Sequence, residues 1–346
     1  MIATSLTDPL TLALSDGQWP KEKANEWYAR QAWILGANFI PSTAVNQLEH
    51  WQANTFDPQT IDRELGYAQS IGMNTMRVFL HYLLWQQDAA GLQERMQQYL
   101  SISEGRSIKT IFVLFDDSWN PAGECGDQPL PKPGVHNSGW LQCPGKALHY
   151  DQEKWNILES YTKGIIGAFR TDPQILFWDI YNEPGNSDYG TSSLPLLQQV
   201  TRWAREAKPE QPISIGLWND NESLNDFFLK HSDITTFHSY NDADIFRKEI
   251  QALQAYGRPI ICTEYMARTN KSIFKTHLPI LKEENAGAIN WGLVSGKTNT
   301  IYPYLSAGGG PEPTLWFHDI FHADGTPFDT EEIHLIKGLT KTDHDH

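Results

Sequence analysis

The chain has 346 residues, of which 40% are hydrophobic, 12% aromatic and only 20% charged. This composition can fill a large core and excludes an intrinsically disordered protein. The formal net charge of -15 argues against a nucleic-acid or membrane-surface partner, because binding phosphate groups requires clustered Lys and Arg side chains that this sequence lacks. A neutral ligand fits the composition better.

The sequence contains no run of about 18 apolar residues, so we expect no membrane-spanning helix. Residues 1–17 lack the basic and apolar blocks of a secretory signal. We therefore expect a cytoplasmic protein if this is the full-length chain, and a periplasmic or secreted one if it is a mature form.

The three cysteines, Cys125, Cys143 and Cys262, are too few and too scattered for a zinc ribbon or a disulfide scaffold. Cys125 and Cys143 fall in one predicted loop and could pair in an oxidising compartment. Two free thiols are the simpler interpretation, and we favour it.

Short apolar or β-branched runs recur along the chain, each followed by a segment with helical spacing. The runs predict eight strands, at residues 32–40, 73–80, 108–115, 175–182, 213–219, 234–240, 259–265 and 287–294. Between the first two, Ile61, Leu65 and Ala68 share one helical face, and Gly72 marks the helix end.

Strands that alternate with helices in this way pair in parallel through right-handed crossovers. The near-continuous apolar character of the runs indicates strands that are buried on both faces. Eight such units predict an α/β fold with a closed (β/α)8 TIM barrel, in a single domain over residues 1–346.

The longest irregular segment spans about residues 116–150 and follows the third strand. A loop of that length inside a compact domain is usually functional, often as a lid or as a wall of a site. A passive surface insertion is the alternative.

Polar and aromatic side chains gather where the predicted strands end, which is where barrels of this kind carry their chemistry. They are Arg77, His81, Asp116, Asp117, Trp119, Asn182, Glu183, Asn219, Asp220, His238, Tyr240, Glu264 and Trp291. Glu183 and Glu264 end different strands, as the two carboxylates of a glycoside hydrolase do: one protonates the leaving oxygen, and the other attacks or activates water.

Each glutamate taken alone is explained equally well by a structural ion pair with Arg77 or a lysine. The two together, with their order and neighbours, favour catalysis. A metal site of His81, Asp116 and His238 is conceivable, but no His-x-His or His-Glu-x-x-His spacing supports it, so we expect neither a metal nor a cofactor.

The sequence resembles the retaining (β/α)8 glycoside hydrolases of clan A, which include cellulases, β-mannanases, β-xylanases and the barrel domains of β-galactosidases and β-glucuronidases. Residues 72–80, 178–184, 237–240, 261–265 and 290–294 carry this resemblance. Residues 36–42, GANFIPS, are similar to the barrel start of the β-galactosidase and β-glucuronidase group.

The resemblance implies that Glu183 is the general acid and base and that Glu264 is the nucleophile. It further implies that Arg77 keeps the nucleophile ionised, that Tyr240 donates a hydrogen bond to it, and that His238 helps to set the acid.

The remaining expected substrate contacts lie around this pair. The resemblance implies that Asn182 binds the sugar 2-hydroxyl and that Trp291 is a platform under the reacting sugar. We expect Trp119 to stack on a sugar ring, and Asp117 and His81, at their strand ends, to contact substrate.

These expectations describe an enzyme that hydrolyses a β-linked neutral glycan or glycoside with retention, its partner being an oligosaccharide or polysaccharide. A transglycosylase of the same fold and an inactive carbohydrate-binding barrel are the alternatives. Retention predicts carboxyl groups about 5–5.5 Å apart, against roughly 6.5–9.5 Å for inversion.

We also expect a raised pKa at Glu183, caused by the neighbouring carboxylate, and a lowered pKa at Glu264 beside Arg77. If the loop after the third strand walls off one end of the cleft, the site becomes a pocket that releases single sugars.

Overall fold

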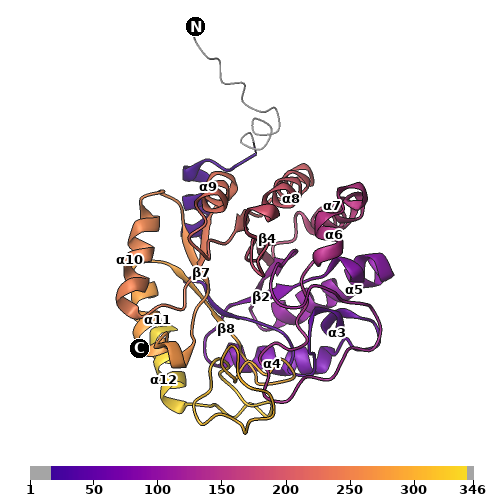
Figure 1. Ribbon diagram of the computed structural model, residues 1–346. Helices are drawn as coiled ribbons and strands as arrows, with labels where there is room; N and C mark the ends of the chain where they lie inside the picture. The colour runs from indigo at the N-terminus through magenta and orange to yellow at the C-terminus, as the bar shows by residue number, and fades with distance from the viewer. Residues whose placement is uncertain (1–16, 341–346) are drawn as a thin grey trace.

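The computed structural model, which describes residues 17–340, contains an eight-stranded parallel β-barrel (Figure 1). The strands are β1 (Leu35–Asn38), β2 (Thr75–Phe79), β3 (Lys109–Val113), β4 (Ile175–Tyr181), β5 (Ile213–Ile215), β6 (Thr235–His238), β7 (Ile260–Glu264) and β8 (Gly287–Trp291). Their order in the sheet is β5-β4-β3-β2-β1-β8-β7-β6. Each strand lies within a range expected from the sequence, so the predicted single-domain (β/α)8 barrel is confirmed.

The ring closes between β5 and β6 through Leu217, which lies just beyond β5. The Leu217 N–H donates to the Thr236 carbonyl at 2.9 Å, and the Leu217 carbonyl accepts from the His238 N–H at 2.7 Å. The hydroxyls of Ser214 and Thr236, 2.7 Å apart, add a side-chain hydrogen bond at the same joint. The carboxyl ends of all eight strands therefore surround one mouth.

Helices cover the outside of the barrel. Among the described residues they are α2 (Lys21–Ala29), α3 (Gln47–Trp51), α4 (Pro58–Ser70), α5 (Tyr82–Gly105), α6 (Lys146–Tyr150), α7 (Asn156–Phe169), α8 (Leu194–Glu206), α9 (Glu222–His231), α10 (Ala243–Gln254), α11 (Phe274–Glu283) and α12 (Thr330–Thr340), with short 3₁₀ turns at Gln152–Lys154, Gly190–Ser193 and Arg268–Asn270. The face predicted from Ile61, Leu65 and Ala68 is the buried face of α4. Within residues 17–340, no helix combines the length and the apolar character needed to cross a membrane.

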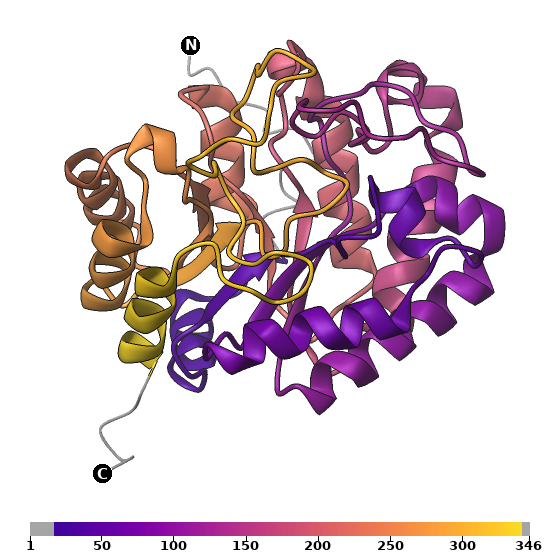
Figure 2. The same ribbon diagram turned by 90° about the horizontal axis from the view of Figure 1, so that it is seen from below.

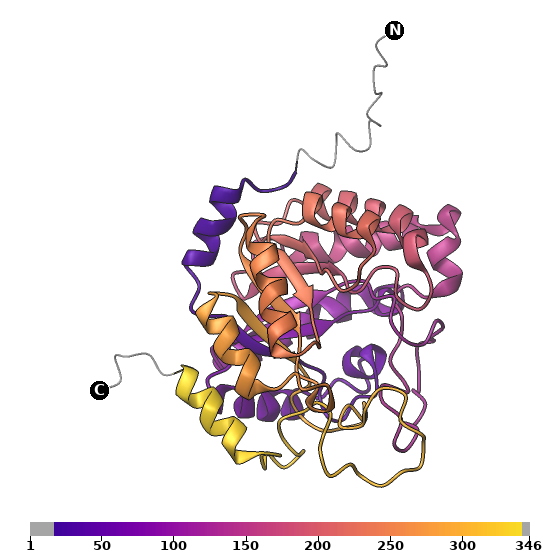
Figure 3. The same ribbon diagram turned by 60° about the vertical axis from the view of Figure 1, so that its left-hand side comes forward.

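Helix α2 covers the amino-terminal end of the barrel. Trp19 and Trp27 pack there in one apolar cluster with residues from inside the barrel, including Ile111, Phe177 and Ile289. Figure 3 shows α2 and the gold segment between β8 and α12 on opposite sides of the strands. A ligand therefore has to enter from the carboxyl ends of the strands.

Three connections at the carboxyl end pack together on one side of the mouth, namely residues 39–46 after β1, 114–145 after β3 and 292–329 after β8 (Figure 2). Backbone hydrogen bonds of 2.8, 2.8 and 3.0 Å join Asn137 to Thr298, Gly309 to Pro133 and Lys297 to Ser42. We call this set of contacts the loop seam. It includes most of the long loop predicted from the sequence, whose last residues form α6.

All three cysteines are free thiols, as favoured from the sequence. The Cys143 sulfur accepts from the Tyr82 N–H at 3.4 Å, and the Cys125 thiol donates to the Leu83 carbonyl at 3.6 Å. Both contacts reach the first residues of α5, so the two thiols attach the segment after β3 to that helix.

A buried carboxyl group, Glu64 of α4, anchors the segment after β1. Its oxygens accept from the Ser42 N–H at 3.0 Å and from the Ser42 hydroxyl. Burial raises the pKa of Glu64 to about 7, against the hydrogen bonds from Ser42, which lower it. The folded protein therefore retains a proton that the unfolded chain releases near pH 4.5.

We expect Glu64→Gln to flatten the pH dependence of stability between pH 4.5 and 7. In this window the folded state binds more protons than the unfolded state, so the free energy of unfolding of the wild type falls as the pH rises. The fall is at most about 3 kcal/mol, since each pKa unit is worth about 1.36 kcal/mol. Urea unfolding at both ends of the window measures it, with the exposed Glu94→Gln as the control. Equal slopes for wild type and Glu64→Gln would contradict the assignment.

Candidate active site

A cavity of about 1050 Å³ opens at the carboxyl ends of the strands. Its lining includes seven of the ten residues predicted to act in the site: Trp119, Asn182, Glu183, His238, Tyr240, Glu264 and Trp291. They come from the ends of β3, β4, β6, β7 and β8 or from the connections that follow. In a parallel barrel these ends face the same mouth, which is why separate stretches of sequence meet here.

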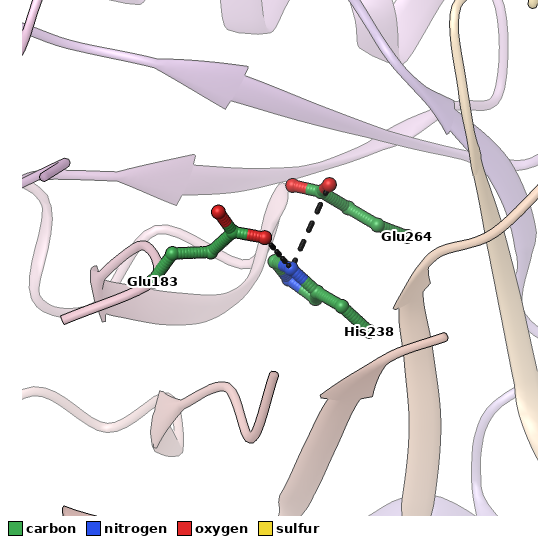
Figure 4. A group of neighbouring side chains, drawn as sticks. All are labelled: Glu183, His238 and Glu264. Atoms are coloured by element: carbon green, nitrogen blue, oxygen red, sulfur yellow. Dashed lines mark hydrogen bonds and ion pairs between the residues drawn. The ribbon is translucent and has the colours of Figure 1, made fainter. Parts of the chain in front are cut away.

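Two glutamates face each other beside a histidine in this cavity (Figure 4). Glu183 follows β4 and Glu264 ends β7, so they approach from different sides of the ring. His238 Nδ1, at the end of β6, lies 2.9 Å from Glu183 Oε1 and 3.6 Å from Glu264 Oε2. One oxygen of each glutamate and a ring nitrogen of His238 all lie within 4.8 Å of one another. Groups this close titrate as one unit.

Glu264 is held from behind by two donors. Arg77 Nη1 donates to Oε1 at 3.0 Å, and the Tyr240 hydroxyl donates to Oε2 at 3.0 Å. Arg77 is completely buried and lies behind Glu264 rather than in the cavity lining. Because both donors require lone pairs on the carboxylate, they favour its ionised form.

The other N–H groups of Arg77 are also paired. Nε and Nη2 lie 3.0 and 2.8 Å from Asp179 Oδ2, and Asn38 Oδ1 accepts from Nη1 at 2.7 Å. Sequence reasoning did not select Asp179 or Asn38. Each is a polar residue within an otherwise apolar strand. Because a buried polar side chain requires a hydrogen-bonding partner, this position in the strand could have identified both residues from the sequence.

Glu183 lies on a tight turn that ends β4. Its φ of 44° is in the left-handed region, which is uncommon for a residue with a side chain. Gly185 follows with a φ of 90°, and a Cβ there would lie 2.9 Å from the Gly190 carbonyl oxygen. The Ser118 hydroxyl and the Asn186 amide donate to Glu183 Oε2 at 3.2 and 2.5 Å. Together, the turn and these donors place the carboxylate in the cavity.

The pKa shifts of the two glutamates are opposite to those expected from the sequence. Burial raises the pKa of Glu264 above its ordinary value, although the charges of His238 and Arg77 lower it. Burial also acts to raise the pKa of Glu183, but the hydrogen bond and charge of His238, together with the hydrogen bonds from Asn186 and Ser118, outweigh it, and the pKa is lowered. The expectation assumed that Arg77 would dominate at Glu264; instead Arg77 is shared with Asp179, while His238 lies closest to Glu183.

His238 itself holds a proton more tightly than an ordinary histidine. Burial alone would lower its pKa, but the charge of Glu264 and the hydrogen bond and charge of Glu183 raise it further than burial lowers it. These shifts favour a proton on His238 rather than on Glu183, and the 2.9 Å contact between Nδ1 and Oε1 gives that proton a direct path between the two groups.

Asp117 and His81 lie behind the cavity lining, not in it. Asp117 accepts from the Tyr181 hydroxyl at 2.7 Å and from the Gly185 N–H at 2.8 Å. His81 Nδ1 caps the first turn of α5, and Nε2 is 3.0 Å from the Gln142 carbonyl. These internal hydrogen bonds replace the substrate contacts expected from the sequence: Asp117 supports the turn of Glu183, and His81 fastens the segment after β3.

Asp116, next to Asp117, does line the cavity and orients two of its neighbours. Its Oδ1 accepts from the Asn182 amide at 3.0 Å, and its Oδ2 accepts from Trp140 Nε1 at 2.9 Å. Burial raises the pKa of Asp116 to about 7, against these hydrogen bonds. Trp140 packs edge-to-face on Trp291, with ring centroids 5.5 Å apart, so Asp116 also supports the expected sugar platform.

Aromatic side chains bound the end of the cavity next to the loop seam. Trp119 stacks on His136 with ring centroids 5.3 Å apart, and Tyr304 lies edge-on to the same ring at 4.7 Å. His136 Nδ1 donates to the Tyr302 carbonyl at 2.8 Å, which joins the segments after β3 and β8. The sequence did not identify His136 or Tyr304, because both lie in irregular segments without a periodic pattern that would place them.

Among the described residues, Glu183, His238 and Glu264 are also the one group of carboxylate, thiol and imidazole side chains close enough to hold a metal ion. His81, Asp116 and His238, the metal site considered from the sequence, do not form such a group. His81 is hydrogen-bonded to the Gln142 carbonyl, and Asp116 to Trp140 and Asn182.

The model of the cellulase family (glycosyl hydrolase family 5) matches residues 134–297, a stretch that contains Glu183, His238 and Glu264. A comparison of the sequence with curated proteins finds no match.

Solved structures share the fold at low sequence identity. The endo-1,4-β-D-mannanase of Thermotoga petrophila is 15% identical over 89% of this chain and 99% of its own, with a TM-score of 0.57. The GH5_18 protein of Streptomyces cattleya, solved with Manβ1-4GlcNAc, is 13% identical over 91% of this chain and 82% of its own, with a TM-score of 0.62. The exo-β-1,4-mannosidase of Opitutaceae bacterium strain TAV5 is 15% identical over 89% of this chain and 60% of its own, with a TM-score of 0.60.

The family match, which covers somewhat less than half of the chain, and the eight-stranded parallel barrel are consistent with a clan A glycoside hydrolase. The match and the fold together support a glycosyl hydrolase that acts on β-glycosides.

We expect Glu183→Gln to lower the pKa of His238, because it removes a negative charge 2.9 Å from Nδ1. NMR of the labelled imidazole ring during a pH titration measures this shift. The control is Glu249→Gln, which neutralises a carboxylate that lines the same cavity but is bonded to Ser239 and Asn241. An unchanged His238 pKa in Glu183→Gln would show that the two groups are not coupled.

Proposed function

We propose that this glycosyl hydrolase removes a terminal sugar from a neutral β-linked glycan, with retention, through a covalent glycosyl-enzyme. Glu264 attacks the anomeric carbon, and Glu183 protonates the leaving oxygen and later activates water. The observation that carries this proposal is the distance between the glutamates. Oxygens of the two lie within 4.8 Å of each other, near the spacing of about 5–5.5 Å of retaining enzymes and below the roughly 6.5–9.5 Å of inverting ones.

Glu264 is suited to nucleophilic attack because of its two donors. Arg77 and Tyr240 each bind one carboxylate oxygen and stabilise the negative charge that burial disfavours. They also fix the orientation of the carboxylate, which reduces the entropy lost on reaching the attacking geometry.

The first step needs a proton on Glu183, and the His238 pair supplies it. As the leaving oxygen develops negative charge, the proton on His238 Nδ1 passes across the 2.9 Å contact to Glu183, which delivers it to that oxygen. Bond formation at Glu264 then removes the largest charge that raises the pKa of His238. In the second step Glu183 takes a proton from the attacking water and passes it back to His238 Nδ1, which restores the resting state of the pair.

Asn182 has one amide N–H available for the sugar. Its carbonyl oxygen accepts from Arg77 Nη2 at 2.7 Å, and one N–H donates to Asp116 at 3.0 Å. The second N–H is therefore oriented for the sugar 2-hydroxyl, a contact that strengthens in the transition state. Trp291, packed against Trp140, offers a face for the same sugar.

The loop seam supports release of single sugars. Three connections are joined there by hydrogen bonds, and Trp119, His136 and Tyr304 bound the cavity at that end. A longer chain would have to pass through this wall to occupy the cavity on both sides of the glutamates. Asn186 and Trp218 also line the cavity, beside Glu183, and this side suits the leaving group.

A β-mannoside is the first substrate class to test. The similar structures include an endo-mannanase, an exo-mannosidase and a protein solved with Manβ1-4GlcNAc. A panel of aryl β-mannoside, β-glucoside, β-galactoside and β-xyloside compares the sugars directly.

We expect Glu264→Ala to lower kcat by about 10⁴-fold or more on every aryl glycoside that the wild type cleaves, because no covalent intermediate forms. Glu183→Ala should lose about 10²–10⁴-fold on substrates with poor leaving groups and far less on a dinitrophenyl glycoside, which needs no acid. NMR of the first-formed anomer should show the β-form. The exposed Glu222→Gln serves as the matched control, and an α-anomer as first product would rule out retention.

We expect a β-1,4-linked tetrasaccharide to yield the single sugar and the trisaccharide as first products, because the seam admits one terminal unit. Chromatography of early time points separates them. Disaccharide in an amount equal to that of the single sugar at the earliest time point would show cleavage inside the chain. This result would contradict a cavity that is closed at the loop seam.

A further inference from the structure

The dipeptide Leu217–Trp218, just after β5, contacts both partners of the proton-carrying pair. The Leu217 carbonyl accepts from the backbone N–H of His238 at 2.7 Å. The Trp218 indole Nε1–H donates to the carbonyl of Pro184, the residue after Glu183, at 3.0 Å. One short stretch of chain therefore holds the histidine on one side and the acid-bearing turn on the other.

The turn of Glu183 needs such support. Glu183 has a φ of 44°, which a residue with a Cβ seldom adopts unless its surroundings impose it. The Gly185 N–H is held by Asp117 at 2.8 Å, and the Asn186 N–H by the Glu183 carbonyl at 3.0 Å. In the described chain, the Trp218 indole is the donor that reaches the carbonyl between these two contacts.

Trp218 is also built into a rigid part of the fold. Leu217, its neighbour, completes the ring of strands by hydrogen bonds to both Thr236 and His238. The indole is half-buried and lines the arm of the cavity on the side of Glu183, with Asn186 and Asn219. Its N–H thus contacts the protein while its ring bounds the space for a leaving group.

We propose that Trp218 is a positioning residue that sets the Glu183 carboxylate against both His238 and the leaving oxygen, and that its ring contacts the leaving-group sugar. This inference rests on the proposed function, in which Glu183 is the acid. Binding of the leaving group on the indole and placement of the acid are then coupled through a single side chain.

The test uses Trp218→Phe, which keeps an aromatic ring but removes the N–H. We expect kcat on a disaccharide, a poor leaving group, to fall about 10-fold or more, because a small displacement of the acid is costly. A dinitrophenyl glycoside of the same sugar should change less than about 3-fold, since it needs no acid. KM for the disaccharide should stay near that of the wild type. In Trp218→Leu, which also removes the ring, the KM for the disaccharide should rise as well.

Trp155→Phe is the matched control, because Trp155 Nε1 also donates to a backbone carbonyl, that of Leu148, at 3.0 Å but away from the cavity. It should leave both substrates unaffected. If kcat of Trp218→Phe fell equally on the two substrates, the role of Trp218 would be structural only, which would contradict the inference. An unchanged kcat on both substrates would also overturn it.

A second readout does not require activity. Displacing Glu183 weakens its contact with Nδ1, so the pKa of His238, followed by NMR, should be lower in Trp218→Phe than in the wild type and Trp155→Phe. If the wild type cleaves no glycoside, the proposed function fails, and this titration still decides whether Trp218 positions Glu183. An unchanged His238 pKa would then overturn the inference.

Discussion

The centre of the barrel depends on one buried cation, Arg77 of β2. A guanidinium with no exposed surface has to be paired, because the penalty for burying an isolated charge is several kcal/mol. Its partners are Asn38 on β1, Asp179 on β4, Asn182 just after β4 and Glu264 on β7. Pairing all the N–H groups of Arg77 therefore brings three further strands to defined positions. It also places Glu264, the proposed nucleophile, and Asn182, whose amide is proposed to face the sugar. Without this cation, Asp179 and Glu264 would be buried carboxylates that repel each other.

The charges around Arg77 also explain why Glu183, the proposed acid, is paired with a histidine. Asp179, Glu183 and Glu264 bring three carboxylates to the centre, against one permanent cation. Proton uptake by His238 reduces this excess of negative charge, and burial strengthens the effect because water screens the charges poorly there. The proton is shared with Glu183, since His238 lies nearer to Glu183 than to Glu264. The excess of negative charge, which would destabilise the fold, thus keeps a proton on this pair, where the proposed mechanism needs it.

The sequence predicted those parts of the structure that follow from backbone periodicity. Apolar runs that alternate with helical segments predict parallel strands, and parallel strands place their carboxyl ends together. Glu183, Glu264 and His238 could therefore be assigned to one mouth from the sequence alone. Periodicity does not say which way a side chain points beyond the strand end. Asp116 and Asp117 show this: neighbours in an extended segment point to opposite sides, and one lines the cavity while the other supports a turn behind it. The directions of the pKa shifts of Glu183 and Glu264 depend on their distances to several charges at once. The order of residues along the chain does not give these distances.

The two ends of the cavity are built on different principles. On the seam side, three connections hold one another by backbone hydrogen bonds, so the wall depends on contacts between loops. On the side of Glu183, support comes from the barrel itself, because β5 is short and Leu217, beyond its end, is needed to complete the ring. Closure of the barrel and the hydrogen bond to the turn of Glu183 therefore fall on adjacent residues, Leu217 and Trp218. A change that shifts this joint would therefore loosen the β5–β6 contact and move Glu183 at the same time.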